Sequence, residues 1–209
     1  MSEDAFNPDL CSQFFKVCLE QDISLKEYCQ GYELLCRLIN QLGSIFKFVT
    51  SDITDKMDIL KNYLAGPDAT HYCNLQSFIH YEVENDKVDF KKRNDSGCRT
   101  FLRLHRALLF VSEFLKELQN HDDAGNLSGM TWKVYEKTLG KYHNWGIRKL
   151  VGVALYTLPT KRQLILKMLR PGLTEEELIG FNTQLIEVLE TIYSKCQEIL
   201  EEHKLLELP

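Results

Sequence analysis

Three arginines at helical spacing, in residues 96–110, form a pattern that can bind phosphate. At about 100° per residue, Arg99, Arg103 and Arg106 fall within one narrow stripe that continues into two phenylalanines. The other faces of this helix are mostly apolar, so we expect it to lie in the interior. A buried charge needs a partner. The partner is either a bound anion or an Asp or Glu elsewhere in the core.

A second charged stripe begins the helix that we expect after Thr50 and Ser51, where a hydroxyl suits the free backbone donors of a helix start. Asp52 and Lys56 are four residues apart, hence neighbours on one face, and their line continues into Ile59 and Tyr63. If the two stripes face each other, they line a pocket with a charged mouth and an apolar interior, which fits an amphiphile. The simpler alternative is an exposed ion pair of little energetic value.

Residues 142–149 form a third cluster, in which aromatic side chains alternate with cations. His143 could serve a ligand, although a lone histidine more often has a structural role. A tryptophan beside tyrosine, isoleucine and two cations suits a membrane interface, although Trp145 could equally belong to the core. The predicted membrane-docking residues are Tyr142, Trp145, Ile147, Arg148 and Lys149.

Composition excludes several classes of function. A net charge of −5 does not suit a nucleic-acid-binding protein. No apolar run approaches the ~18–20 residues that span a bilayer, and the acidic first residues do not resemble a secretory signal. The seven cysteines include no Cys-x-x-Cys pair, so we expect reduced, buried thiols in a cytosolic protein, without a metal or other cofactor. Nucleophile-elbow, zinc-protease and phosphate-loop motifs are missing from the sequence, which argues against an enzyme.

Apolar residues recur at intervals of three and four almost throughout, which predicts one all-α domain spanning residues 1–209. Thr174 and Glu177 form a capping-box pattern before the last helix, and a polar loop is expected at 91–97. We find no alternating strand pattern. The roughly eight predicted helices cover residues 34–49, 52–64, 74–87, 97–118, 131–139, 144–158, 161–169 and 175–203.

Several segments, in this order, resemble the glycolipid transfer protein superfamily, and most closely its ceramide-1-phosphate transfer branch. The resemblance implies a two-layer sandwich of about eight helices that encloses a lipid cavity. It rests on LGSIFKF at 42–48, DxxxK at 52–56, SGCRTxLRLHRAL at 96–108, YHxW at 142–145, TLPT at 157–160 and LLxLP at 205–209.

The resemblance also implies roles for individual residues. Asp52 corresponds to the residue that accepts the sphingolipid amide N–H, and His143 corresponds to the residue that donates to the amide carbonyl. The cations that hold the headgroup phosphate correspond to Lys56, Arg99 and Arg103, with Arg106 in a supporting role.

The headgroup preference follows from residue chemistry at three positions. Members of the superfamily that bind neutral glycolipids are expected to have Trp in place of Arg103, Asn in place of Lys56 and Lys in place of Ile59. A guanidinium binds phosphate oxygens bidentately and an ammonium adds a point charge, so phosphate is favoured over sugar. Asn144 and Gly146 depart from the pattern of the branch beside the docking tryptophan.

The resemblance therefore implies a non-enzymatic carrier that moves ceramide-1-phosphate or a related phosphosphingolipid between membranes. We expect a cytosolic monomer that contacts internal and plasma membranes transiently, with some help from anionic lipids. Two alternatives stay open. The protein could be a lipid sensor or interaction module of the same fold, or its cargo could be a sulfated or neutral glycosphingolipid.

Overall fold

Helices make up almost all the secondary structure in the computed structural model, which describes residues 6–91, 96–122, 124–169 and 171–209. Within these residues lie nine α-helices and three short 3₁₀ turns, at Ser44–Phe46, Ala69–His71 and Gly140–Tyr142. No helix of this described part is both long and apolar enough to cross a membrane. The α-helices are α1 (Pro8–Glu20), α2 (Leu25–Leu42), α3 (Lys47–Ala65), α4 (Leu75–Glu84), α5 (Gly97–Asn120), α6 (Leu127–Thr138), α7 (Trp145–Leu155), α8 (Lys161–Met168) and α9 (Glu175–Glu202).

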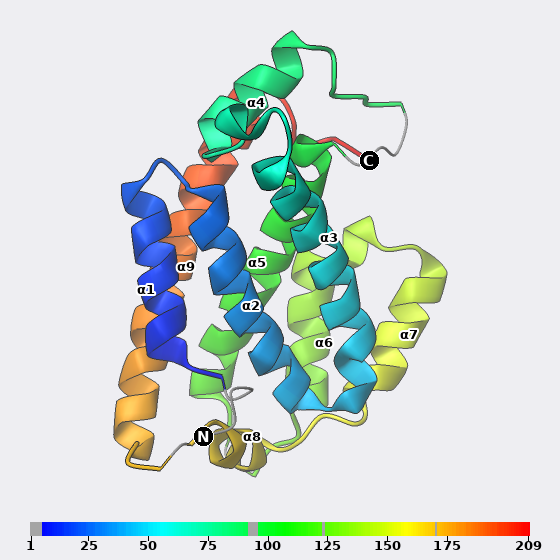
Figure 1. The fold of residues 1–209 in the computed structure, drawn as a ribbon. Helices are drawn as coiled ribbons and strands as arrows, with labels where there is room; N and C mark the ends of the chain where they lie inside the picture. Colours follow the sequence, from blue (N-terminus) through cyan, green and yellow to red (C-terminus); the bar gives the residue numbers. More distant parts are fainter. Residues whose placement is uncertain (1–5, 92–95, 123, 170) are drawn as a thin grey trace.

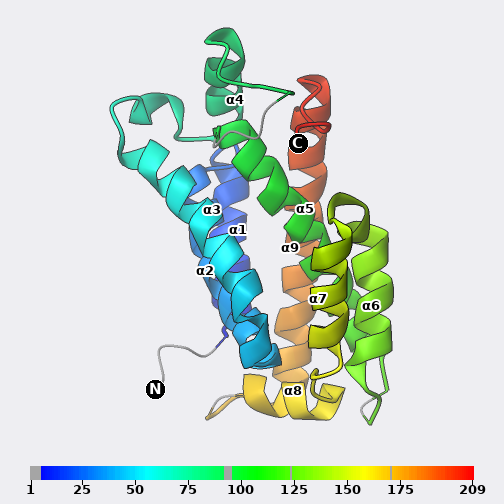
Figure 2. The same cartoon turned by 90° about the vertical axis from the view of Figure 1, so that its right-hand side faces the viewer.

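The helices form two layers, as predicted. One layer consists of α1, α2 and α3, and the other of α9, α5, α6 and α7 (Figures 1 and 2). Contacts between α1 and α9 and between α3 and α5 join the layers, while α8 lies across one end and α4 at the other. The arginine helix α5 therefore faces α3, which carries the second charged stripe.

Buried side chains from both layers form one continuous hydrophobic cluster. Tyr28 of α2 packs against Phe101 of α5 with ring centroids 4.7 Å apart, and the Tyr32 hydroxyl donates to the carbonyl oxygen of Leu104. These contacts tie α2 to the arginine helix across the interface between the layers. The cysteines agree with the prediction of unpaired thiols, because all seven are free and only Cys73 is exposed.

Polar side chains begin most of the helices. The predicted capping box of α9 is confirmed, because Thr174 accepts from the Glu177 N–H and Glu177 accepts from that of Thr174. An equivalent box, not predicted, begins α8. Such caps contribute about 1 kcal/mol each. Single caps of the same kind are provided by Asn7, Asn74, Ser96, Asn126 and Asn144.

The predicted helix start after Ser51 is wrong. The chain breaks at Gly43, whose φ of 139° ends α2, and α3 already begins at Lys47 after one 3₁₀ turn. The hydroxyl of Thr50 lies 3.2 Å from the Lys47 carbonyl oxygen inside the helix and does not cap it. Helix α1 precedes the first predicted range, and residues 92–95 of the predicted polar loop lie outside the described residues.

Candidate lipid-binding site

The start of α5 is fixed by a buried carboxylate that the sequence analysis missed. Glu82 of α4 accepts from the N–H groups of Gly97 and Cys98 at 2.6 and 2.9 Å, and from the Tyr72 hydroxyl at 3.0 Å. A Cβ on Gly97 would lie 2.9 Å from the Glu82 carboxylate oxygen, so glycine permits the close approach. The carboxylate neutralises free donors at the positive end of the helix. It thereby sets the position of the first turns of α5, which carry Arg99.

The predicted cations of α3 and α5 meet at Asp52. The Lys56 ammonium lies 2.5 Å from Asp52 Oδ1 and the Arg103 guanidinium 3.6 Å from the same oxygen. The Lys56 side chain is only 7% exposed, whereas Asp52 is 60% and Arg103 40% exposed. Burial lowers the pKa of Lys56, and the adjacent Asp52 opposes that shift. The site thus has a buried ammonium at its base and an accessible rim.

Helices α3 and α5 run in opposite directions. This corrects the prediction that the apolar ends of their two stripes line one pocket. Asp52 near the start of α3 meets Arg103, whereas Tyr63 near its end stacks on Tyr72 at 4.4 Å, beside the carboxylate that caps α5. Figure 1 shows the same antiparallel course. The apolar ends of the two stripes therefore diverge from the charged cluster, one toward Tyr63 and the other toward Phe114. They do not line one interior.

His143 joins the same electrostatic cluster. Its Nδ1 lies 2.8 Å from the hydroxyl of Tyr135 on α6. Burial lowers the pKa of His143, Asp52 opposes that effect, and Arg103 and Lys56 reinforce it. Four predicted headgroup and amide residues therefore lie within mutual electrostatic reach, although they come from three separate parts of the chain.

Arg99 and Arg106 contact the C-terminal segment. Arg99 Nε donates to a main-chain oxygen of Pro209 at 2.5 Å, and Arg106 Nη2 donates to the Leu206 carbonyl at 2.7 Å. The Arg106 guanidinium also lies 3.9 Å from the centroid of the Tyr142 ring. The supporting role of Arg106 stays a prediction. Arg99 lies one helical turn before Arg103, and its Nε–H is bonded to the C-terminal segment.

The predicted docking residues surround the start of α7. Trp145 is 75% exposed, and Tyr142 and Ile147 are also exposed. The Lys149 ammonium lies 5.7 Å from the centroid of the Trp145 ring. Arg148 differs from the rest, because it donates to Glu136 at 2.8 Å and to the Gly140 carbonyl at 3.1 Å. Its main contacts hold the turn that carries His143.

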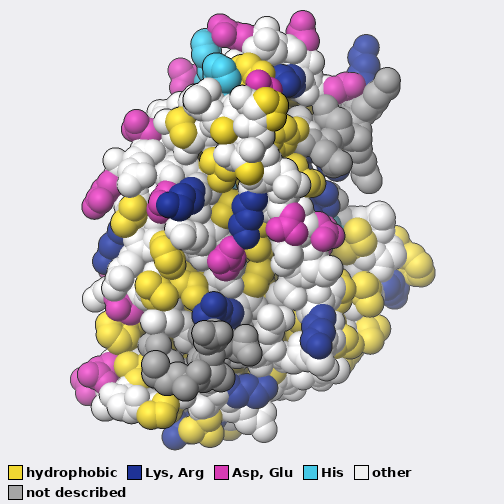
Figure 3. Space-filling view, in the orientation of Figure 1, with side chains coloured by type: hydrophobic (Ala, Val, Ile, Leu, Met, Phe, Trp, Pro, Cys, Tyr) yellow, Lys and Arg dark blue, Asp and Glu magenta, His cyan; other side chains and the backbone are white. Residues whose placement is uncertain are grey.

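The exposed apolar surface extends further along α7 than the sequence analysis indicated. Val153 is 60% and Tyr156 82% exposed, and Leu150 is also exposed. Val153 and Tyr156 line an open groove of about 780 Å³ together with Trp132 of α6. In Figure 3, hydrophobic and Lys or Arg side chains gather over the edge where Figure 1 places α7.

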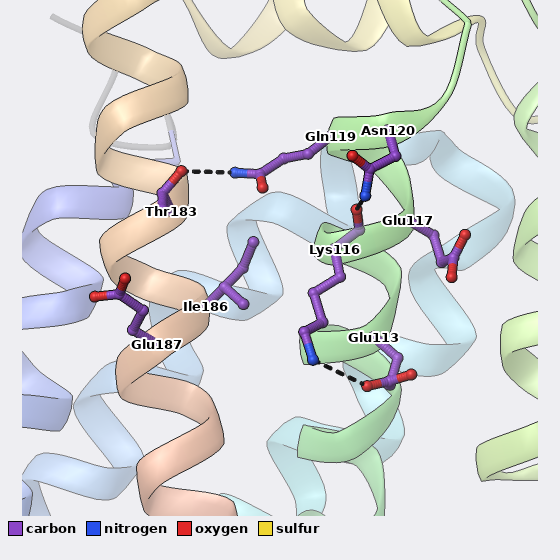
Figure 4. A pocket seen from close by; sticks show the side chains of 8 residues that line it. All are labelled: Glu113, Lys116, Glu117, Gln119, Asn120, Thr183, Ile186 and Glu187. Carbon is purple, nitrogen blue, oxygen red and sulfur yellow. Dashed lines mark hydrogen bonds and ion pairs between the residues drawn. The ribbon is translucent and has the colours of Figure 1, made fainter.

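A second pocket, of about 430 Å³, lies between α5 and α9, and seven of its eight lining residues are polar or charged (Figure 4). Across it, the Gln119 amide donates to Thr183 at 3.0 Å. Neither this pocket nor the α6–α7 groove is the enclosed lipid cavity of the prediction, which stays a prediction. In the described residues no group of three or more His, Cys, Asp or Glu could hold a metal ion. The residues that line the pocket between α5 and α9 are Glu113, Lys116, Glu117, Gln119, Asn120, Thr183, Ile186 and Glu187.

The structure is an all-α sandwich in which cations, a carboxylate and an imidazole lie together, and it has the fold of a class of helical lipid-transfer proteins. The chain belongs to the glycolipid transfer protein (GLTP) family, whose model matches residues 23–170. Proteins of this family transfer lipids and are not enzymes, which confirms the predicted family and the prediction that the chain is not an enzyme.

The similarity to named relatives extends over nearly the whole chain. The chain is 39% identical to the ceramide-1-phosphate transfer protein of Xenopus tropicalis over 201 residues, with 93% of each covered. It is 34% identical to the Homo sapiens protein of the same name, covering 100% of this chain and 99% of that one.

Two crystal structures show the same fold. One is the apo form of mouse ceramide-1-phosphate transfer protein (TM-score 0.90), and the other is the human protein in complex with 12:0 ceramide-1-phosphate (TM-score 0.89). Each is 33% identical to this chain, covering 98% of it and 100% of the solved chain. The fold class predicted from the sequence is therefore confirmed.

Proposed function

We propose that this protein extracts ceramide-1-phosphate from one membrane and carries it to another. The observation that carries the proposal is the cluster at Asp52, where Lys56 and Arg103 from facing helices share one carboxylate oxygen. A phosphate monoester would take the two cations, with Arg99 adding charge from the next turn. The Asp52 carboxylate would then accept the amide N–H of the lipid. The relatives named for this lipid support the proposal.

Energetics explain why such a lipid needs a carrier. A two-chain sphingolipid has on the order of 30 methylenes, and exposing each to water costs ~0.8 kcal/mol. An apolar interior cancels most of this cost but distinguishes poorly between lipids, because all their tails are hydrocarbon. Charge-assisted hydrogen bonds of ~1.5–3 kcal/mol each then select the headgroup.

The proposal includes the setting in which the protein works. It acts in the cytosol as a monomer, with residues 1–209 forming one domain, and it touches membranes transiently through Trp145 and its neighbours. The continuous core cluster and the buried, unpaired thiols support this setting. The exposed aromatic and cationic side chains around α7 support membrane contact, which anionic lipids would strengthen.

A vesicle-to-vesicle transfer assay tests the function. Donor vesicles contain fluorescent ceramide-1-phosphate, acceptors contain none, and unlabelled sulfated or neutral glycosphingolipids compete for the protein. We expect catalytic amounts of protein to empty the donors, and ceramide-1-phosphate to compete best. A lipid sensor would bind the lipid without emptying the donors, and stronger competition by a glycolipid would identify that lipid class as the cargo.

A further inference from the structure

Tyr135 is a buried residue of α6 whose hydroxyl reaches the site histidine. Its side chain is 2% exposed, and its hydroxyl lies 2.8 Å from Nδ1 of His143. The two ring centroids are 5.6 Å apart. Among the described residues, His143 is the one hydrogen-bond partner of this hydroxyl.

Burial decides the direction of this hydrogen bond. It raises the pKa of Tyr135 and lowers that of His143, so both groups are neutral near pH 7. A neutral imidazole carries one N–H, on either Nδ1 or Nε2. If Nδ1 carried the proton, the buried phenol O–H would have no acceptor, which is costly. The favoured arrangement has Tyr135 donating to a bare Nδ1, with the proton of His143 on Nε2.

The surrounding turn holds the imidazole in place for this bond. The N–H of His143 donates to the Gly140 carbonyl at 3.4 Å, closing the 3₁₀ turn before it. Arg148 donates to the same carbonyl at 3.1 Å and to Glu136 at 2.8 Å, which anchors the turn to α6. The Tyr135 hydroxyl, which contacts Nδ1, and the main chain of His143 are therefore held together through α6 and this turn.

We propose that Tyr135 is a positioning residue that fixes His143 as its Nε2–H tautomer and so makes it a hydrogen-bond donor to the bound lipid. The inference rests on the proposed function, in which His143 donates to the amide carbonyl while Asp52 accepts the amide N–H. An amide presents one acceptor, its carbonyl, and one donor, its N–H. With Asp52 as the acceptor, only the Nε2–H tautomer of His143 provides the donor that the carbonyl needs. The other tautomer would turn an acceptor toward the carbonyl and repel it.

Nitrogen NMR of the free protein tests the tautomer without any lipid. With ¹⁵N-histidine labelling, and His143→Asn to assign the signals, we expect His143 to show a bare Nδ1 and a protonated Nε2 near pH 7.5. In Tyr135→Phe, the signals should move toward a mixture of tautomers. A protonated Nδ1 in the wild type, or an unchanged tautomer ratio in Tyr135→Phe, overturns the proposal. If Tyr135→Phe does not fold, the wild-type spectrum alone decides.

Transfer measurements test the consequence for specificity. Loss of one hydrogen bond predicts about a fivefold slower transfer of ceramide-1-phosphate by Tyr135→Phe. Phosphatidic acid, which has the same phosphate monoester but no amide, should be affected less. Tyr32→Phe is the matched control, because it also removes a buried tyrosine hydroxyl, one bonded to Leu104, and it should leave the ratio of the two lipids unchanged. If Tyr135→Phe leaves the ratio of ceramide-1-phosphate to phosphatidic acid transfer unchanged, the inference is overturned. If the wild type transfers no ceramide-1-phosphate, the proposed function is overturned, and the NMR measurement still tests the tautomer.

Discussion

At the scale of single residues, the surroundings of Lys56 support the proposed binding of an anion. Burial alone would favour a neutral amine, and the Asp52 carboxylate at 2.5 Å opposes that tendency. Arg103 contacts the same carboxylate from the facing helix. Two cations thus share one anion, so the cluster has spare positive charge that a phosphate would neutralise. The cations therefore lie close together in the structure, as the proposed headgroup site requires.

Removing one of these cations should reduce transfer far more than it reduces stability. We expect Lys56→Ala, Arg99→Ala and Arg103→Ala each to slow ceramide-1-phosphate transfer at least about tenfold, since each loses a charge-assisted hydrogen bond. Lys61→Ala is the control, because Lys61 lies on the same helix and pairs with Glu33 at 2.6 Å. Initial rates from the vesicle assay provide the measurement, and circular dichroism checks the fold. Wild-type rates in all three variants would refute the headgroup assignment.

His105 is a second buried histidine, with an effect on stability. Its ring stacks on Tyr193 at 4.3 Å and its Nε2 lies 2.8 Å from Gln197. Burial lowers its pKa from 6.5 to about 4; the hydrogen bond that its Nε2–H donates to Gln197 Oε1 opposes this shift, and Arg106 reinforces it. Between those pH values the unfolded chain binds a proton that the folded chain does not. The free energy of unfolding must therefore decrease as pH falls from about 6.5 toward 4.

His105→Phe should weaken this pH dependence, because phenylalanine can keep the stacking but cannot be protonated. Urea denaturation at pH 7 and pH 4.5 measures it. We expect the wild type to lose roughly 2–3 kcal/mol more than the variant between the two conditions. Equal losses would mean that His105 is protonated in the folded protein as readily as in the unfolded chain.

At the scale of elements, the position of α5 depends on its cap. Glu82 accepts from two N–H groups at the start of the helix and from a tyrosine hydroxyl, so Glu82→Gln would turn an amide NH₂ toward donors. We expect a loss of about 2–3 kcal/mol in the free energy of unfolding, measured with urea. Glu84→Gln, on the same helix but exposed and paired with His80, should cost less than about 0.5 kcal/mol. Similar losses in both variants would contradict the capping role.

The sequence predicted which residues share a helix face better than it predicted how neighbouring helices are oriented and where they begin. Helical spacing placed the cations of α5 on one stripe, and the structure brings Arg103 to Asp52. Spacing does not reveal the direction in which a neighbouring helix runs, so the divergence of the two apolar stripes was not predictable. The break at Gly43 was missed because the apolar period continues across it, and the hydroxyl of Ser51 offered a plausible but wrong start.

Two parts of the site had no local signal at all. A glutamate between apolar residues of a helix normally marks the exposed face, and only the tertiary structure shows Glu82 buried against α5. The apolar run of α7 is equally typical of a core helix, yet Val153 and Tyr156 are exposed. In both cases burial depends on how the neighbouring helix packs, α5 against α4 and α6 against α7, and a local sequence pattern does not show that packing.

At the scale of the whole molecule, the docking surface and the headgroup cluster share one turn. Tyr142 of the surface stacks on Arg106 of α5, and the next residue, His143, belongs to the cluster. Trp145 begins the helix that follows. A membrane that binds this surface would therefore lie beside the residues that we propose to receive the headgroup. This arrangement suits extraction of a lipid directly from the bilayer.

Reducing the apolar surface of α7 should weaken membrane binding without disturbing the fold, because these side chains make few internal contacts. Trp145→Ala is expected to lower partitioning onto anionic vesicles about tenfold, since an aromatic ring loses its place at the interface. The matched pair Val153→Ala and Val17→Ala removes the same atoms from α7 and from α1 of the opposite layer. Only the α7 variant should bind more weakly. Vesicle sedimentation measures partitioning, and transfer should slow in parallel because docking precedes extraction. Unchanged sedimentation of Trp145→Ala, or equal losses in the two valine variants, would place membrane contact on another face.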